Sequence, residues 1–425
     1  MKTILIPAFT TFPGGGLMHF LLQAVRALAA CRPDWKLVLI GSISMETQPE
    51  ELPDNVNVRY IDNDRFSKTI YELTHWLLKP SGKSQDTGYL LQSRFERLRW
   101  KWGNIGILKE YLPAADVIWI PNYSIVLDQI ALYPLLQGST VPILTTIHDI
   151  HPAFYPEDHS PQNLKRFYQG FVPFAQDCSA IITHSEYQKA AIQHHLQIPA
   201  EKIYVTPQPP LIDPTRLLQA HSDQPTGDFF KATGQHPFVF YPASTTHVHK
   251  NHTRLLVAWS LLKQQLGEQC PLLVCTGKGS RRQWQGLQSL IAGFDLQDRV
   301  IFTGPVSTPI LAALYQHCQF VILPTLYEGA GSGILTDAYL MGKPVLSSPL
   351  PQIQEQLTTL HDARIQFMAS DSVIGIVNAV LQQLHKQNEG QQADPIQAAD
   401  RKAEFQHLWQ VWAKFYTEKM EQLAR

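Results

Sequence analysis

Short apolar runs alternate with helix-type segments along the chain, and this alternation constrains the fold more than any other feature. The apolar runs fall at residues 4–8, 36–41, 117–121, 142–147 and 180–183, and after a polar stretch they restart at 238–241, 272–276, 300–302, 320–323 and 345–348. Runs that are apolar on both faces are typical of parallel strands covered by helices on either side. The pattern therefore predicts an α/β fold with two doubly wound, Rossmann-like sheets.

The length of the chain also favours two domains. A chain of 425 residues, 44% of them hydrophobic, is too long for a single core. Three prolines end the first series at residues 207–210, and a polar stretch at 211–236 follows. We expect an N-terminal domain over residues 1–207 and a C-terminal domain over residues 208–400, which face each other across a ligand-binding cleft.

The last segment, residues 401–425, has the spacing of an amphipathic helix with a large aromatic face. The residues on this face are Phe405, Leu408, Trp409, Trp412, Phe415, Tyr416, Met420 and Leu423. An apolar face of this size needs a groove to bury it. We expect the helix to cross back and pack on the N-terminal domain.

Charge and cysteine content restrict the class of protein. Charged residues make up 17% of the chain and the net charge is −1, so no global basic field attracts nucleic acid or an anionic membrane. The five cysteines form no CxxC pair, and we expect all of them to be buried free thiols in a reducing compartment. No run reaches the roughly 18 apolar residues of a membrane span, and the first residues lack the pattern of a signal peptide. The sequence therefore predicts a cytoplasmic protein that binds any anionic ligand at a local site.

One basic and aromatic segment, residues 94–102 (RFERLRWKW), differs from the rest of the chain. Basic and aromatic side chains together suit a peripheral membrane contact or an anionic lipid-linked acceptor. The aromatic residues do not fall on one helical face, however. A surface helix with partly buried tryptophans is the alternative interpretation.

The run from residue 320 to 348 combines a strand, a glycine-rich turn and the start of a helix. A helix N-terminus with free N–H groups binds phosphate, and glycines let the backbone approach it closely. Carboxylates on both sides, Glu328 and Asp337, suit a ligand with hydroxyl groups near its phosphates. The turn residues Gly329, Gly331, Ser332 and Gly333 are therefore candidates for binding a nucleotide sugar. The alternative is a plain strand-to-helix turn with Glu328 as a solvated surface charge.

A second candidate is Lys250, in the run YPASTTHVHKNH at the start of a helix. Cleavage of a sugar–phosphate bond builds negative charge on the leaving group, and a fixed cation stabilises that charge. A solvated lysine at the start of a helix is the alternative. The nearby histidines His247, His249 and His252 have no carboxylate or cysteine beside them, so we expect no metal site there.

Further candidates follow strands of the first series. His148 and Asp149 stand in the run TTIHDIHP, and Asn122 and Tyr123 follow the run VIWIP. All four are expected at the carboxyl ends of strands, with Asp149, Asn122 and Tyr123 on the acceptor side. The alternatives are a hydrogen-bonded core histidine, a capping aspartate and loop residues without a ligand. Gly15 and Gly16 belong to the first glycine turn. This turn is either a loop that binds a ligand or a tight turn without a ligand.

These motifs resemble those of the retaining glycosyltransferases of family 4, which have the two-domain GT-B fold. The run over 320–348 is similar to their E–x7–E signature, and HKNH is similar to a segment of several mannosyltransferases in that family. The sequence departs from the signature because its second acid is an aspartate, one residue further on than Thr336. It also has Ser244 where many members have an arginine, and Arg254 or Lys278 would then supply the cation.

The resemblance assigns roles to the candidate residues. Glu328 would contact the donor sugar, Asp337 would hold the ribose hydroxyls, and Lys250 would neutralise the leaving diphosphate. His148 would lie against the donor sugar. In the same way, the turn of Gly15 and Gly16 would close over the donor phosphate or the acceptor. The backbone near Val306 would bind the base.

The resemblance implies a hexosyltransferase without a cofactor or catalytic metal. It would transfer a sugar from a nucleotide diphosphate donor, with GDP-mannose slightly favoured, to a glycan or lipid-linked acceptor. Transfer would retain the anomeric configuration by a front-face mechanism, in which the leaving phosphate helps to deprotonate the acceptor. Two other functions stay open. One is a nucleotide-sugar epimerase or hydrolase, and the other is a catalytically silent protein that binds a nucleotide or glycan.

Overall fold

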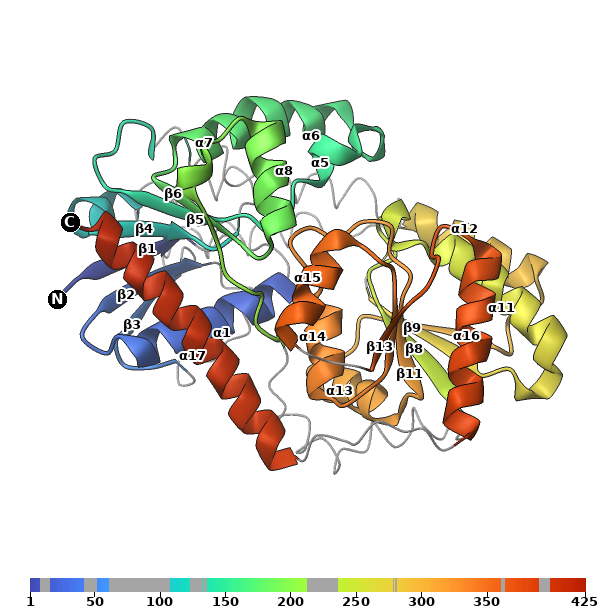
Figure 1. Cartoon of the computed structure of the whole chain (residues 1–425). Helices are drawn as coiled ribbons and strands as arrows, with labels where there is room; N and C mark the ends of the chain where they lie inside the picture. Colours follow the sequence, from blue (N-terminus) through green and yellow to red (C-terminus); the bar gives the residue numbers. More distant parts are fainter. Residues whose placement is uncertain are drawn as a thin grey trace, which may run out of the picture. The chain divides into compact units, whose positions relative to one another are not determined.

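The chain forms two units, each built around a parallel sheet (Figure 1). The computed structural model describes residues 1–7, 16–41, 52–60, 108–122, 133, 136–211, 236–277, 279, 281–360, 364–389 and 398–425. The first unit comprises Met1–Thr183, Lys189–Thr206 and Gln410–Arg425, and the second comprises His184–Gln188 and Pro207–Trp409. The predicted α/β architecture with two parallel sheets is confirmed, whereas the exact domain boundaries stay a prediction.

Seven parallel strands form the described sheet of the first unit, in the order β3-β2-β1-β4-β5-β6-β7. Their bounds are β1 Thr3–Pro7, β2 Lys36–Gly41, β3 Val56–Tyr60, β4 Val117–Ile120, β5 Ile143–Thr146, β6 Ala180–Thr183 and β7 Ile203–Val205. Every residue of β4, β5 and β6 is buried. This explains why the three strands are apolar, with threonine as their only polar residue type. The strand order reverses between β1 and β4, so ligands are expected beside the carboxyl ends of these two strands.

Helices of the first unit cover this sheet. The longer ones are α1 Gly16–Cys31 and α8 Glu186–Leu196, whose first turn is counted with the second unit. Shorter ones are α5 His151–Phe154, α6 Pro161–Arg166, α7 Val172–Asp177, a π-turn at Phe167–Phe171 and 3-10 turns at Leu112–Ala114, Pro156–Asp158 and Ala200–Lys202. The N–H of Gln188 donates to Ser185 Oγ at 3.1 Å, so Ser185 caps α8 as its sequence predicts.

Six parallel strands form the described sheet of the second unit, in the order β10-β9-β8-β11-β12-β13. Their bounds are β8 Phe238–Pro242, β9 Leu272–Thr276, β10 Val300–Gly304, β11 Phe320–Leu323, β12 Val345–Ser347 and β13 Ile365–Phe367. The strand order reverses between β8 and β11. The loops after these two strands therefore form the expected ligand site of this sheet.

The helices of the second unit pack on both faces of its sheet. They are α11 His252–Leu266, α12 Arg281–Gly293, α13 Thr308–His317, α14 Gly333–Leu340, α15 Pro351–Leu360 and α16 Val373–Asn388, with 3-10 turns at Val248–Lys250 and Gly267–Gln269. In Figure 1, α11 and α16 lie on one side of the sheet and α13 and α14 on the other. Apolar side chains of these strands and helices form one continuous core, in which Trp259, Tyr315 and Phe240 are almost fully buried.

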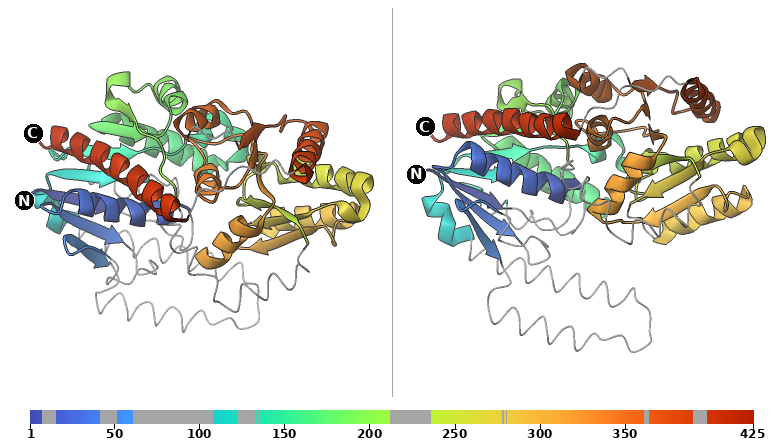
Figure 2. Two further views of the ribbon diagram at one scale, coloured as in Figure 1. Left: turned by 60° about the horizontal axis from the view of Figure 1, so that its bottom comes forward. Right: turned by 90° about the horizontal axis from the view of Figure 1, so that it is seen from below.

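The C-terminal helix α17, Ala398–Leu423, contributes to both units. Its second half lies beside α1 (Figure 2). There Trp412 stacks on Tyr416 with ring centroids 3.9 Å apart, and Phe20 and Trp119 contact the same indole ring. The Tyr416 hydroxyl is 2.8 Å from Thr146 Oγ1 in the sheet. Its first half is counted with the second unit, where the Trp409 indole donates to the carbonyl of Pro210 at 3.0 Å.

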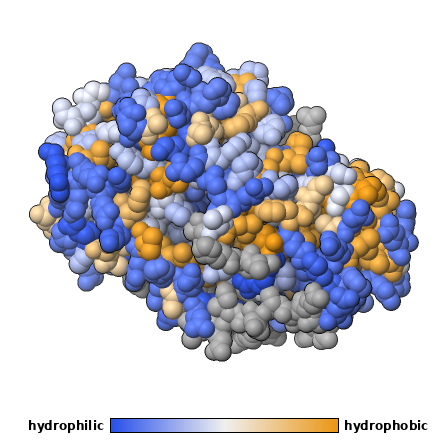
Figure 3. Space-filling model, in the orientation of Figure 1, coloured by the Kyte–Doolittle hydropathy of each residue, from blue (hydrophilic) through white to orange (hydrophobic). Residues whose placement is uncertain are grey.

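The surface and the cysteines complete the description of the two units. Hydrophilic residues cover much of the face drawn in Figure 3, and large exposed hydrophobic residues such as Ile374 and Val411 belong to separate elements. Among the helices of the described residues, none combines the length and hydropathy needed to cross a bilayer. All five cysteines are free, but the prediction that all are buried is wrong for Cys31, which is exposed because it ends α1.

Candidate functional site

Lys250 and Glu328 meet at the point where the strand order of the second sheet reverses. Lys250 lies in the loop after β8, and Glu328 lies in the loop after β11. The Lys250 ammonium is 2.6 Å from Glu328 Oε1, and the two side chains are 17% and 11% exposed. Two of the three predicted catalytic side chains, 78 residues apart in sequence, therefore form one mostly buried ion pair.

The backbone around Lys250 is fixed by its neighbours. Asn251 adopts a left-handed conformation with φ of 62°, and its amide donates to the carbonyls of Pro324 at 2.9 Å and Ser370 at 2.7 Å. The Tyr241 hydroxyl donates to the Lys250 carbonyl at 2.7 Å. Sequence reasoning missed Asn251. The available signal was an asparagine directly before a helix, since asparagine tolerates this conformation better than most residues.

The glycine-rich turn leads from Glu328 into α14. The helix begins at Gly333, and Ser332 precedes it in an extended conformation without capping the helix through its side chain. The first N–H groups of a helix have no partner within the helix and carry the positive end of its dipole. The turn therefore ends in a helix start of the kind that can bind an anion, a few residues after Glu328 in the chain.

Asp337 lies one turn into α14 and is buried, with 6% of its surface exposed. Its Oδ1 accepts a hydrogen bond from the N–H of Leu211 at 3.1 Å. The neighbouring Thr336 donates to the carbonyl of Gly333 in its own helix at 3.0 Å. The acidic residue of this helix is therefore Asp337, one residue after Thr336. Its contact with a ribose stays a prediction.

Ser244 takes the place of the arginine that many members of the resembled family have, and it forms hydrogen bonds within the loop after β8. Ser244 Oγ lies 2.6 Å from Thr246 Oγ1 and accepts from the N–H of Thr246. Of the two proposed substitute cations, Arg254 donates to Asn251 Oδ1 at 3.0 Å, which places it in support of the same loop. Lys278 lies outside the described residues. Val306, at the end of β10, is half-buried against the core of the second unit.

His252 is a buried, neutral histidine close to Lys250 in sequence. Burial, together with the charge of Lys250, lowers the pKa of His252 to about 4. Its ring lies 4.8 Å from that of Tyr241. His247 and His249 stack on each other with centroids 5.2 Å apart. All three histidine rings therefore pack against other rings of the second unit.

His148 belongs to the first unit and follows β5. Its Nε2 lies 3.1 Å from the carbonyl of Pro121, and its ring packs edge-on against Phe20 at 4.8 Å. Burial lowers the pKa of His148, so the ring is neutral near pH 7, and its Nε2–H donates a hydrogen bond to the Pro121 carbonyl. Asp149 Oδ1 accepts a hydrogen bond from the N–H of His151 at 3.1 Å. This contact corresponds to the alternative interpretation of Asp149, a capping residue of the next turn. Asn122 follows β4 and is half-buried.

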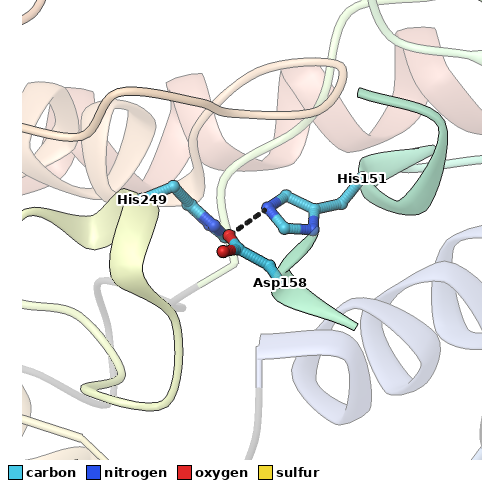
Figure 4. A group of neighbouring side chains, drawn as sticks. All are labelled: His151, Asp158 and His249. Carbon is cyan, nitrogen blue, oxygen red and sulfur yellow. Dashed lines mark ion pairs between the residues drawn. The ribbon is translucent and has the colours of Figure 1, made fainter. Parts of the chain in front are cut away.

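The structure shows a histidine cluster in the first unit that sequence reasoning did not find. His151 Nδ1 lies 2.7 Å from His159 Nε2, and His151 Nε2 forms an ion pair of 3.7 Å with Asp158 (Figure 4). The His151 ring also stacks on Tyr155. All of these residues belong to α5 and the turn after it, so the signal was a high local density of histidine and acidic residues.

Several predicted residues lie outside the described part of the chain. They are Gly15, Tyr123 and residues 94–102, so the predicted ligand loop, the acceptor contact and the membrane contact stay predictions. Gly16, which the sequence predicts in the first glycine turn, is the first residue of α1.

Comparison with known families matches two parts of the chain. Residues 79–210 match the family described as Glycosyltransferase Family 4, and residues 236–386 match the family described as Glycosyl transferases group 1. The chain is 24% identical over 225 residues to the O-antigen chain mannosyltransferase RfbU of Salmonella typhimurium. This match covers 53% of the chain and 56% of the length of that relative.

Solved structures support the fold over nearly the whole chain. HepE from Anabaena, solved in complex with UDP and glucose, has a TM-score of 0.67 at 17% identity and covers 99% of this chain and 100% of its own. WaaG, a glycosyltransferase involved in lipopolysaccharide biosynthesis, has a TM-score of 0.58 at 16% identity, with 97% and 95% covered. The two parallel sheets and these neighbours establish a two-domain, Rossmann-like GT-B fold. The chain carries a Glycosyltransferase Family 4 domain over residues 79–210 and a Glycosyl transferases group 1 domain over residues 236–386.

Proposed function

We propose that this chain is a glycosyltransferase that binds a nucleotide diphosphate sugar in its second unit. The observation that carries the proposal is the mostly buried Lys250–Glu328 pair at the reversal point of the second sheet. A plain surface turn would leave both side chains solvated. Two charged groups held together in this way are costly to desolvate, which is typical of a functional site.

The chemistry of the site suits a leaving nucleotide diphosphate. Negative charge develops on the diphosphate as the bond to the sugar breaks, and Lys250 together with the N-terminus of α14 would stabilise it. Glu328 would then accept hydrogen bonds from sugar hydroxyls. Asp337 is proposed for the ribose, and the backbone near Val306 for the base. His148, Asp149, Asn122 and the turn of Gly15 and Gly16 stay predicted contacts of the donor or acceptor.

The finer features of the reaction rest on family resemblance. We propose retention of the anomeric configuration by front-face transfer, without a catalytic metal or cofactor. A GDP-mannose donor is slightly favoured, because the relative RfbU is described as a mannosyltransferase and the HKNH segment resembles that of mannosyltransferases. A glycan or lipid-linked acceptor is proposed on the same basis, and residues 94–102 are proposed for a peripheral membrane contact.

Turnover of a panel of nucleotide sugars tests the proposal. GDP-mannose, UDP-glucose and ADP-glucose are each incubated with the protein, with and without a mixture of glycan and lipid-linked glycan acceptors, and release of the nucleoside diphosphate is measured. We expect one donor to be consumed, with release that depends on the acceptor. Consumption without an acceptor would instead favour a hydrolase, and conversion without release would favour an epimerase. Nucleotide binding without any turnover would favour the silent protein.

A further inference from the structure

Helix α15 directs two glutamine side chains at the glycine-rich turn. Gln352 and Gln356 stand one helical turn apart, on the same side of α15, and are 2% and 7% exposed. The Gln352 amide donates to the carbonyl of Glu328. Gln356 makes two bonds to Ser332, because its Oε1 accepts from the N–H at 2.9 Å and its Nε2 donates to the carbonyl at 3.0 Å. The two glutamines therefore hold the two ends of the turn.

The backbone of the turn lies directly against Gln356. Gly331, in the middle of the turn, has a φ of +149°, and a Cβ added there would lie 3.2 Å from Gln356 Oε1. A turn of this kind, outside helices and strands, lacks the regular backbone hydrogen bonds that fix the shape of those elements. The three bonds from α15 supply that constraint, and they act on Glu328 and Ser332, the residues on either side of Gly329–Gly331.

An amide side chain suits both positions, 352 and 356. Gln356 donates and accepts at once and Gln352 donates, both without a charge, whereas a glutamate cannot donate to a carbonyl and would repel a bound diphosphate. Both side chains are buried, so their polar atoms are stabilised only through such bonds. A third glutamine on the same helix, Gln354, is exposed and bonds instead to the carbonyl of Pro349 at 3.1 Å.

We propose that Gln352 and Gln356 are positioning residues that hold the Glu328–Ser332 turn in the shape that binds the donor diphosphate. Gln352 fixes the backbone of Glu328, and with it the carboxylate beside Lys250. Gln356 fixes Ser332, and with it the N–H groups at the start of α14. This inference rests on the proposed function, because it concerns the same diphosphate site.

Binding measurements on three matched variants test the inference. GDP, UDP and ADP are titrated into the wild-type protein and into Gln352→Met, Gln356→Met and Gln354→Met, and the matching nucleosides are followed by ligand-observed NMR. We expect the first two variants to lose at least about tenfold in affinity for the diphosphate, which corresponds to ~1.4 kcal/mol. Nucleoside affinity should stay unchanged, because base and ribose do not contact the turn. Gln354→Met should bind both ligands as the wild type does.

A fourth variant tests the chemistry of the amide. Gln356→Glu keeps the size and the acceptor of the side chain but loses its donor and adds a negative charge. It should also lose at least about tenfold in diphosphate affinity at pH 7, because the bond to the Ser332 carbonyl is lost and the carboxylate repels the diphosphate.

The outcomes separate this inference from the proposed function. If the wild type binds a diphosphate and Gln352→Met, Gln356→Met and Gln356→Glu bind it equally well, only the positioning role is overturned. An equal loss of nucleoside and diphosphate affinity would also overturn it, because it would show general damage to the unit. If the wild type binds none of the three diphosphates, the inference and the proposed function both fail.

Discussion

Replacing Lys250 with alanine is expected to lower the rate of sugar transfer by about 10²–10³-fold, the usual effect of removing one group that stabilises developing negative charge. In the structure the ammonium is held 2.6 Å from Glu328 Oε1 and is mostly buried. Its attraction for the leaving diphosphate is therefore weakly screened. The measurement is nucleoside diphosphate release at saturating donor, made at a temperature where both proteins are folded.

Lys263 provides the matched control for this substitution. It lies on helix α11, which begins just after the turn that carries Lys250, and forms ion pairs with Asp295 and Asp298 at 3.3 Å and 2.8 Å, so Lys263→Ala also removes a paired cation. It should leave the rate of transfer within about twofold of wild type, because its ion pairs involve no residue of the proposed donor site and exposed pairs of this kind contribute little to stability. Equal rates in Lys250→Ala and Lys263→Ala would remove Lys250 from the proposed mechanism.

The second large effect concerns stability. Trp412→Ala is expected to lower the free energy of unfolding of the first unit by about 3–5 kcal/mol, the usual effect of truncating a buried tryptophan. The indole is 1% exposed and packs on Tyr416, Phe20 and Trp119, which come from α17, α1 and β4. Its removal would leave a cavity between helix and sheet. Scanning calorimetry measures the effect as a lower transition temperature.

The neighbouring residue separates loss of packing from the general effect of an alanine substitution in this helix. Val411 precedes Trp412 on α17 and is 50% exposed. Val411→Ala should change the free energy of unfolding by no more than about 0.5 kcal/mol. If Trp412→Ala melts like Val411→Ala, then residues 410–425 do not stabilise the first unit, and the predicted return of the C-terminal helix is wrong.

The central strands were predictable because burial on both faces makes them continuous apolar runs. The observed bounds of β2 and β9 agree with the apolar runs predicted from sequence at residues 36–41 and 272–276. The strands that the sequence did not predict are β3, β7 and β13, and each of them lies at an edge of its sheet. Edge strands are covered less completely, so they are short and mix polar with apolar residues. In β3, for example, Asn57 and Arg59 interrupt the apolar pattern.

The candidate site was predictable in part for a related reason. The sequence places Lys250 and Glu328 directly after strands, and parallel strands end at the same edge of a sheet. It does not show that β8 and β11 are neighbours, on which the 2.6 Å contact depends. Gln352 and Gln356 could not be found from sequence, because their function depends on the packing of α15 against the turn.

Nucleotide-dependent thermal stabilisation tests the central claim, a nucleotide diphosphate site in the second unit, most directly. GDP, UDP, ADP and their sugar conjugates are compared on the wild-type protein and on Lys250→Ala. A ligand at about 100 times its Kd stabilises the folded protein by roughly 2.7 kcal/mol, which raises the melting temperature measurably. One nucleotide family should stabilise the wild type, and Lys250→Ala should respond far less. If no nucleotide raises the melting temperature, or if Lys250→Ala responds as strongly as the wild type, the second unit does not hold the proposed diphosphate site at Lys250.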